Sequence, residues 1–240
     1  MTQIQNHNIM SKGVFGLGCS YTWGEGLYYY SDLENLPFSE EHYFDYNNIT
    51  PSMMLYKDRF KYTQLVADYL NTWCWTNRGN GGSIRSSIND YARREFINND
   101  KFKYSDFKLL IYQFTEYYRD SSDGMSDYEL IESQINLVDD LCSDFEEAGV
   151  KVITLSWFDN IPQHPTYLSK FKNRHLDIEF DNIVKPGFDY FLRDDEYNMT
   201  IQSDFSKKGF QKNDLHFNKK GHRLIADLII KKLEQDNFKI

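Results

Sequence analysis

Residues Gly13 to Leu27 read GVFGLGCSYTWGEGL, and this stretch determines how we interpret the rest of the chain. It opens with a short apolar run, Gly13 to Leu17, typical of a strand buried on both faces. The run stops at Gly18, and Ser20 follows among small and turn-forming residues. Such an ending presents a hydroxyl at the carboxyl edge of a parallel sheet, where open α/β sheets bind ligands. The alternative is an ordinary strand-to-helix turn in which Ser20 caps the helix.

Two nucleotide-binding motifs are excluded by the same stretch. Gly16-Leu17-Gly18 opens like a dinucleotide-binding fingerprint, but Tyr21 stands where that motif requires a third glycine for close packing. No Gly-Lys-Ser/Thr follows, so the stretch is not a phosphate-binding P-loop either.

The composition predicts a single globular domain over residues 1–240. Charged residues make up 26% of the chain and hydrophobic residues 40%, as in ordinary soluble domains of this length. The formal net charge is −9 and no Lys/Arg-rich run occurs, which argues against a nucleic-acid partner.

The sequence shows no targeting or membrane segment. The first residues, MTQIQNHNIMSK, lack the apolar core of a secretory signal, and no apolar run approaches the ~18 residues that span a membrane. The three cysteines are few, odd in number and widely spaced, as in proteins with reduced thiols. We therefore expect a cytoplasmic protein without a membrane span.

Apolar runs and amphipathic segments alternate along the chain. Further strands are predicted at 73–75, 108–114, 150–156 and 176–184, and helices at 62–70, 84–96, 128–148 and 218–233. This alternation predicts a three-layer α/β/α fold, a flavodoxin-like parallel sheet of about five strands with long loop insertions.

Two long segments carry no sustained period and are predicted to be irregular. The first, residues 28–59, leaves the chain directly after the Ser20 turn, so we interpret it as a lid or insertion beside that edge of the sheet. Its aromatic side chains would then line the pocket wall. The second, residues 157–211, is polar, aromatic and broken by prolines, and is interpreted as an irregular insertion.

Three further stretches follow predicted strands and join Ser20 at the same edge. They are the glycine loop that ends at Gly82, the short polar side chain of Thr115, and the segment from Asn213 to His222 before the last helix. Acyl transfer needs a nucleophile, an oxyanion hole and an oriented base, and these stretches contain candidates for each.

The order of these stretches resembles the SGNH hydrolases, the GDSL-type esterases and lipases. Gly18-Cys19-Ser20-Tyr21-Thr22 is similar to the family's Gly-Asp-Ser turn, with Cys19 in place of Asp. Gly82 falls on the family's second glycine, and Thr115 falls on the Asn of its Gly-x-Asn-Asp motif. His216 falls on the final His, and the following Asn218-x-x-Gly221-His222 resembles the family's entry into the last helix.

The resemblance implies a serine ester hydrolase that needs no cofactor and no metal. Ser20 would attack the ester, His216 would take its proton, and Asn213 or Asp214 would orient His216. The backbone N–H groups of Ser20 and Gly82, with the Thr115 hydroxyl, would hold the oxyanion. The substrate would be a small acyl ester, such as an O-acetylated carbohydrate.

Two departures from the family pattern support an alternative. Asn213 stands where the family keeps its Asp, and Thr115 stands where it keeps Asn. Both changes argue against catalysis. The first removes a carboxylate, and the second shortens the reach of an oxyanion donor. The alternative is a catalytically impaired SGNH-fold binding or structural module that recognises a glycan or a partner protein.

Two neighbouring side chains are assigned structural roles. Cys19 is expected to point into the core, because strand alternation turns it away from the side that Ser20 faces. His222 is expected to belong to the last helix and to take no part in the chemistry.

The orienting residue of His216 can be tested by exchange of the two candidates. Position favours Asn213, whereas charge favours Asp214, because a carboxylate stabilises an imidazolium better than an amide does. We predict that Asn213→Asp raises esterase turnover and that Asp214→Asn barely changes it. Loss of turnover in a folded Asp214→Asn protein, together with a silent Asn213→Ala, would contradict this assignment.

Overall fold

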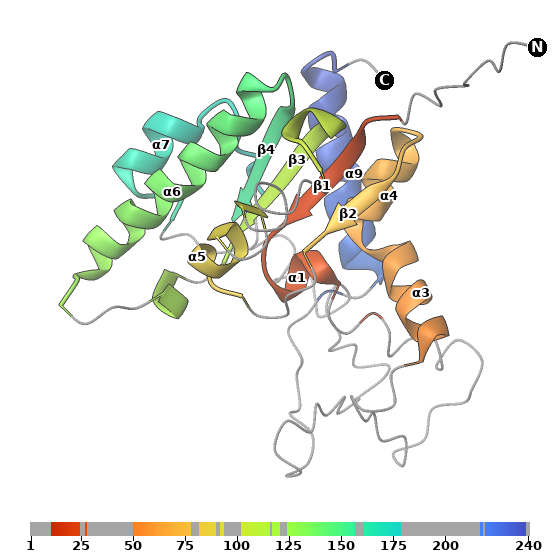
Figure 1. The fold of residues 1–240 in the computed structure, drawn as a ribbon, viewed down its shortest axis with the longest axis horizontal. Coiled ribbons are helices and arrows are strands. Elements are labelled where there is room, and N and C mark those ends of the chain that lie inside the picture. Colours follow the sequence, from red (N-terminus) through yellow and green to blue (C-terminus); the bar gives the residue numbers. More distant parts are fainter. Residues whose placement is uncertain are drawn as a thin grey trace, which may run out of the picture.

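A computed structural model provides the structure of the chain, and it describes most of the predicted core. The described residues are 11–24, 27, 50–77, 82–89, 92–93, 102–115, 117–120, 124–156, 161–178, 217 and 219–238. Within them lies one parallel sheet (Figure 1). Its strands are β1 (Gly13–Leu17), β2 (Cys74–Thr76), β3 (Phe107–Phe114) and β4 (Lys151–Ser156).

The strand order is β2-β1-β3-β4, and every pair is parallel. β1 therefore lies between β2 and β3, with Gly16 opposite Thr76 on one side and Leu17 opposite Tyr112 on the other. This order matches the first four strands of the flavodoxin-like winding 2-1-3-4-5. The predicted α/β fold with a parallel sheet is confirmed.

The described part of the chain contains four strands, not the five that the sequence predicts. Next to β4, His175 makes a single parallel bridge with Thr154. The Thr154 N–H donates to Arg174 O at 2.8 Å, and Leu176 N–H donates to Thr154 O at 2.9 Å. The chain thus passes beside β4 just before the predicted strand 176–184. Residues 176–178 do not continue as a strand, and 179–184 lie outside the described residues.

One face of the sheet packs against α5 (Ile84–Ser86), α6 (Asp127–Glu147) and α7 (Pro165–Phe171) (Figure 1). Phe15 and Leu17 of β1 point to this side, as alternate residues of a strand do. The long helix α6 contributes a buried stripe at helical spacing. Its members include Ile131, Ile135, Val138, Leu141, Cys142 and Phe145.

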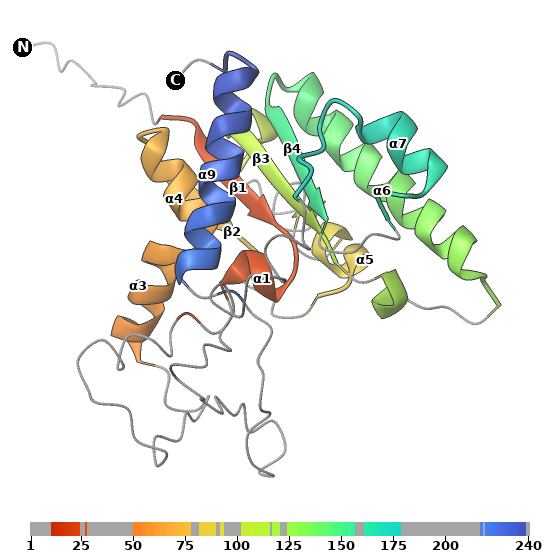
Figure 2. The same ribbon diagram turned by 180° about the vertical axis from the view of Figure 1, so that it is seen from behind.

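The other face packs against α4 (Tyr62–Tyr69) and α9 (Lys219–Gln235), which lie across the strands in Figure 2. Val14, Leu109 and Ile111 point to this side and form a second buried cluster with both helices. Two layers of helices therefore enclose the sheet, which is the three-layer α/β/α arrangement that the sequence predicts.

The helix ends carry the expected capping residues. Ser126 and Glu129 form a capping box at the start of α6, with Ser126 N–H donating to the Glu129 carboxylate at 2.9 Å. Hydrogen bonds from Ser126 lower the pKa of Glu129. After α6, Gly149 adopts a φ of 77°, a left-handed conformation that ends helices and that glycine adopts without strain.

Two helices lie in segments that the sequence analysis treated as irregular. α3 (Pro51–Phe60) occupies the end of the first segment, and α7 lies within the second. Each begins with proline at its first position, after a cap by Thr50 or His164. Proline is well suited to that position because its missing N–H has no partner there, so prolines read as helix breakers were helix starts. Residues 28–49 lie outside the described residues.

His222 has the structural role that the sequence predicts. Its ring is fully buried, and its Nδ1 accepts the backbone N–H of Tyr62 at 3.2 Å. The imidazole also stacks on the Tyr62 ring, with centroids 5.7 Å apart. His222 therefore joins α9 to the start of α4 on one face of the sheet.

None of the helices in the described part of the chain combines the length and the apolar character that crossing a bilayer requires.

Gly16 makes the closest packing between β1 and α4, and it provides a test of the fold. A Cβ at this position would lie 2.5 Å from Thr63 Cγ2 and 2.9 Å from Thr76 Cγ2. Gly16→Ala is predicted to lower the free energy of unfolding by about 1–3 kcal/mol, measured by urea denaturation. Thr63→Ser removes the nearer methyl and should recover part of that loss in the double variant. Strictly additive effects would contradict this packing.

Candidate active site

Ser20 lies where the central strand β1 ends and the short helix α1 (Ser20–Trp23) begins (Figure 1). The residue is 7% exposed, so it is nearly enclosed by the turn and its neighbours. Because β2 and β3 flank β1 in parallel, their carboxyl ends lie on either side of this turn. The strand order thus places Ser20, the predicted nucleophile, between the carboxyl ends of β2 and β3.

The Asn77 side chain holds the turn from the β2 side. Its Oδ1 accepts the Gly18 N–H at 3.3 Å, and its Nδ2 donates to Gly18 O at 2.8 Å. Asn77 is fully buried and follows directly after β2. One amide therefore satisfies both backbone groups of a buried residue at the point where the strand stops.

The Gln113 side chain holds the same turn from the β3 side. Its Oε1 accepts the Cys19 N–H at 3.2 Å, the Cys19 thiol at 3.0 Å and the Thr22 hydroxyl at 3.2 Å. The Thr22 oxygen in turn lies 2.7 Å from the Tyr62 hydroxyl. Since Thr22 donates to Gln113, Tyr62 is the donor in that pair. Burial raises the pKa of Tyr62, which keeps its hydroxyl protonated as this role requires.

Cys19 points into this polar network and away from solvent. Its side chain is buried, and its thiol donates to Gln113. This position agrees with the expectation that Cys19 faces the protein interior.

Thr115 lies one residue beyond β3, as the sequence predicts. It is 2% exposed, and its Oγ1 has no hydrogen-bond partner among the described residues. A buried hydroxyl without a partner is costly, since the group has lost its water. Its place at a strand end beside the Ser20 turn makes it a candidate donor to a bound oxygen.

Gly82 follows β2 along the chain and lies just before α5. Ser83 caps this helix by accepting the Ser86 N–H at 3.1 Å, and Gly82 immediately precedes the cap. A Cβ at Gly82 would lie 3.0 Å from Ser86 Oγ, so this segment passes close to the first turn of α5. Residues 78–81 of the predicted glycine loop lie outside the described residues.

The predicted base and its orienting partner lie outside the described residues. These are His216, Asn213 and Asp214. The next residue along the chain, Phe217, is fully buried and packs in the cluster beneath α4 and α9. The predicted contact between Ser20 and His216 therefore stays a prediction.

Among the described residues, no group of three His, Cys, Asp or Glu side chains is arranged so that it could hold a metal ion. The polar groups around Ser20 are amides, hydroxyls and a thiol. They suit hydrogen bonding to a neutral or developing negative oxygen.

Comparisons with known proteins give a structural likeness only. No protein-family model matches the sequence, and no curated protein sequence matches it. The psychrotrophic esterase EstA from Pseudoalteromonas sp., in a structure inhibited by monoethylphosphonate, aligns over 95% of this chain and 100% of its own. The TM-score is 0.52 and the sequence identity 10%.

A carbohydrate esterase, whose active site displays divergent catalytic and non-catalytic binding functions, aligns over 94% of this chain at 13% identity and a TM-score of 0.51. This chain spans 65% of that protein's length. The acetyl xylan esterase AlAXEase aligns more weakly, with a TM-score of 0.45 at 12% identity over 91% of this chain and 98% of its own. The first two comparisons show that the chain shares its α/β fold with esterases.

The two amides that position Ser20 were not singled out by the sequence analysis. A signal was present, because each is a polar residue at the end of a strand. Their role depends on strand register, which the sequence does not state.

Asn77 offers a direct test of how the turn is held. Asn77→Ala would leave the buried N–H and C=O of Gly18 without partners. We predict a loss of about 2–6 kcal/mol in the free energy of unfolding, from about 1–3 kcal/mol for each of the two unsatisfied groups. Chemical denaturation would measure it, with the exposed Asn173→Ala as control. Equal stability of the two variants would contradict the role of Asn77 in holding the turn at Gly18.

Proposed function

We propose that this chain is a serine ester hydrolase of the SGNH type that acts on a small acyl ester. The observation that carries the proposal is the position of Ser20 at the end of β1, between two flanking strands, together with the Thr115 hydroxyl, which is buried at the end of β3 and has no partner among the described residues. Esterase folds of the same α/β architecture support it. The resemblance of the sequence motifs supplies the roles of the remaining residues.

The mechanism assigns one step to each group. Ser20 Oγ attacks the ester carbonyl carbon, and His216 takes the hydroxyl proton while the carbonyl electrons move onto oxygen. Collapse of this intermediate expels the alcohol, which receives the proton from His216. Water then repeats the sequence on the acyl-enzyme and releases the acid. Asn213 or Asp214 holds the imidazole of His216 in the required tautomer.

The oxyanion is assigned three donors, the backbone N–H groups of Ser20 and Gly82 and the hydroxyl of Thr115. The Thr115 hydroxyl is already desolvated, so it would not have to give up water when negative charge develops beside it. One such donor contributes roughly 3 kcal/mol of transition-state stabilisation. A bound carbonyl oxygen would also give this hydroxyl the acceptor that it lacks among the described residues.

We assign an O-acetylated carbohydrate as the substrate class. One of the proteins with a similar fold is a carbohydrate esterase, which makes this class reasonable for a small acyl ester. The fold alone does not select a substrate, so the pocket chemistry has to do so.

A binding module without catalysis is the second candidate, and Asn213 in the place of the family's Asp is the observation that favours it. The carbohydrate esterase of similar fold combines catalytic with non-catalytic binding functions in its active site. On this alternative, the same edge of the sheet would hold a glycan without cleaving it.

Labelling with a fluorophosphonate separates the two candidates. The probe reacts with serines that an adjacent base activates, so we predict stoichiometric modification of Ser20, located by peptide mass spectrometry. Ser20→Ala should abolish the label, and His216→Ala should slow it at least ~100-fold through loss of the base. Ser169→Ala, an exposed hydroxyl on α7, should label like the unaltered protein. A folded protein that stays unlabelled would reject catalysis in favour of binding.

A further inference from the structure

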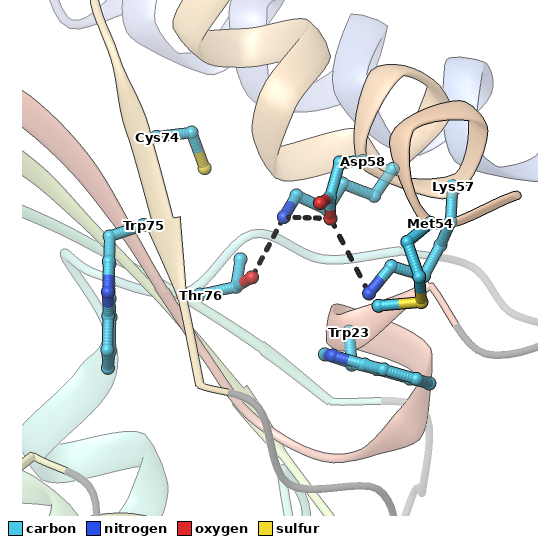
Figure 3. A pocket seen from close by; sticks show the side chains of 8 residues that line it. Trp23, Met54, Lys57, Asp58, Cys74, Trp75 and Thr76 are labelled. Carbon is cyan, nitrogen blue, oxygen red and sulfur yellow. Dashed lines mark hydrogen bonds and ion pairs between the residues drawn. The ribbon is translucent and has the colours of Figure 1, made fainter. Parts of the chain in front are cut away.

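A second polar site lies beside α1, in a pocket bounded by α1, α3 and the edge strand β2 (Figure 3). The pocket has a volume of about 500 Å³, within the range of small-molecule sites. Figure 3 shows two lysine side chains, from α3 and from the junction of α3 and α4, reaching toward one aspartate. The Trp23 ring of α1 forms the adjoining wall.

Lys61 is the best-defined cation of this pocket. Its side chain is 7% exposed, and its Nζ donates to Asp58 Oδ1 and to Thr76 Oγ1, both at 2.9 Å. A lysine ammonium has three N–H donors. The third has no acceptor among the residues that the structure describes, although the group is almost completely removed from water.

Lys57 adds a second buried ammonium. Its side chain is 1% exposed, and its Nζ lies 3.5 Å from Asp58 Oδ1 and 3.6 Å from the centroid of the Trp23 ring. Burial raises the pKa of the Asp58 carboxyl, but the ammonium groups of Lys61 and Lys57 outweigh this and hold it below its ordinary value. Asp58 is therefore ionised and serves both lysines.

The described residues that line the pocket carry two ammonium groups, Lys57 and Lys61, and one carboxylate, Asp58. Together these three side chains carry one formal positive charge, whereas the whole chain carries −9. The Asp58 side chain is 47% exposed, and solvent weakens its compensation of two buried cations.

The pocket lies next to the proposed nucleophile. Trp23 and Ser20 are three residues apart on α1, so their Cβ atoms are about 5–6 Å apart on the helix surface. On the other wall, Thr76 immediately precedes Asn77, which holds Gly18. One small molecule could therefore extend from this pocket to Ser20.

We propose that this pocket binds the carboxylate of the substrate, with Lys61 as its principal ligand. The substrate class is then an acidic carbohydrate ester, a sugar that carries a carboxylate as well as the acyl group. This inference rests on the proposed esterase function for the identity of the substrate. The anion site itself rests on the contacts of Lys61, Asp58 and Thr76.

Binding is tested first, on the Ser20→Ala protein so that no turnover interferes. Isothermal titration calorimetry would compare glucuronate with glucose at one ionic strength. We expect glucuronate to bind at least about tenfold more tightly, the size of one charge-assisted hydrogen bond. Equal affinities for the two sugars, or no binding of glucuronate, would overturn the proposal.

Three variants assign the effect to the pocket. Lys61→Gln should weaken glucuronate binding about tenfold, whereas Arg59→Gln, the same charge change at an exposed position of α3, should leave it unchanged. Asp58→Asn removes the competing carboxylate and should tighten binding. A gain of affinity cannot come from damage to the fold, so this variant decides the matter even if Lys61→Gln fails to fold. Unchanged or weaker binding by Asp58→Asn would overturn the proposal.

Hydrolysis of O-acetylated glucuronate and O-acetylated glucose then separates this proposal from the esterase function. A higher kcat/KM for the acidic ester, reduced selectively in Lys61→Gln, supports both. Hydrolysis of the two esters at equal rates would leave the esterase standing and reject the carboxylate site. Binding of glucuronate without hydrolysis of either ester would do the reverse, keeping the anion site and rejecting the esterase.

Discussion

The candidate site depends on the hydrogen bonds by which two amide side chains hold the turn after β1. Asn77 binds both backbone groups of Gly18, and Gln113 binds Cys19 and Thr22 from the opposite side. Each amide follows or ends a strand that flanks β1, so the sheet itself places them. The close approach also demands glycine at position 18, where a Cβ would meet Gln113 Oε1 at 2.9 Å. The position of Ser20 is thus a property of three strands.

Sequence patterns predicted the elements whose signal is local. The apolar runs of β1, β3 and β4 and the periodic stripe of α6 were found within a few residues of their observed limits. The predictions were wrong where proline carried two meanings. Residues 28–59 and 157–211 were interpreted as irregular, although Pro51 and Pro165 each start a helix after a capping residue. A fifth strand was predicted at 176–184, and the described part of that range, 176–178, follows an isolated bridge between His175 and Thr154.

In the candidate site, too, some residues could be predicted from local sequence patterns and others could not. Ser20, Gly82 and Thr115 could be proposed because they stand at the ends of predicted strands in a familiar order. Asn77 and Gln113 could not be assigned a role, since only the parallel register shows that they meet the same turn. The Lys61 pocket was beyond prediction for a further reason. It needs α3, a helix that the sequence analysis did not predict, and the hydrogen bond from Lys61 to Thr76 of β2, which only the packing of the two elements produces.

The spacing of these contacts along the chain bears on how the protein acquires its site during synthesis. Gly18 lies 59 residues before Asn77, and Cys19 lies 94 residues before Gln113. Contacts of such high sequence separation form late and slow a chain's folding, because loop closure costs entropy before any pairing repays it. A nascent chain that has emerged only as far as β2 therefore carries Ser20 on an unsupported turn. The Ser20 turn is held from both sides only once β3 has joined the sheet, which ties the completion of the candidate site to the completion of the core.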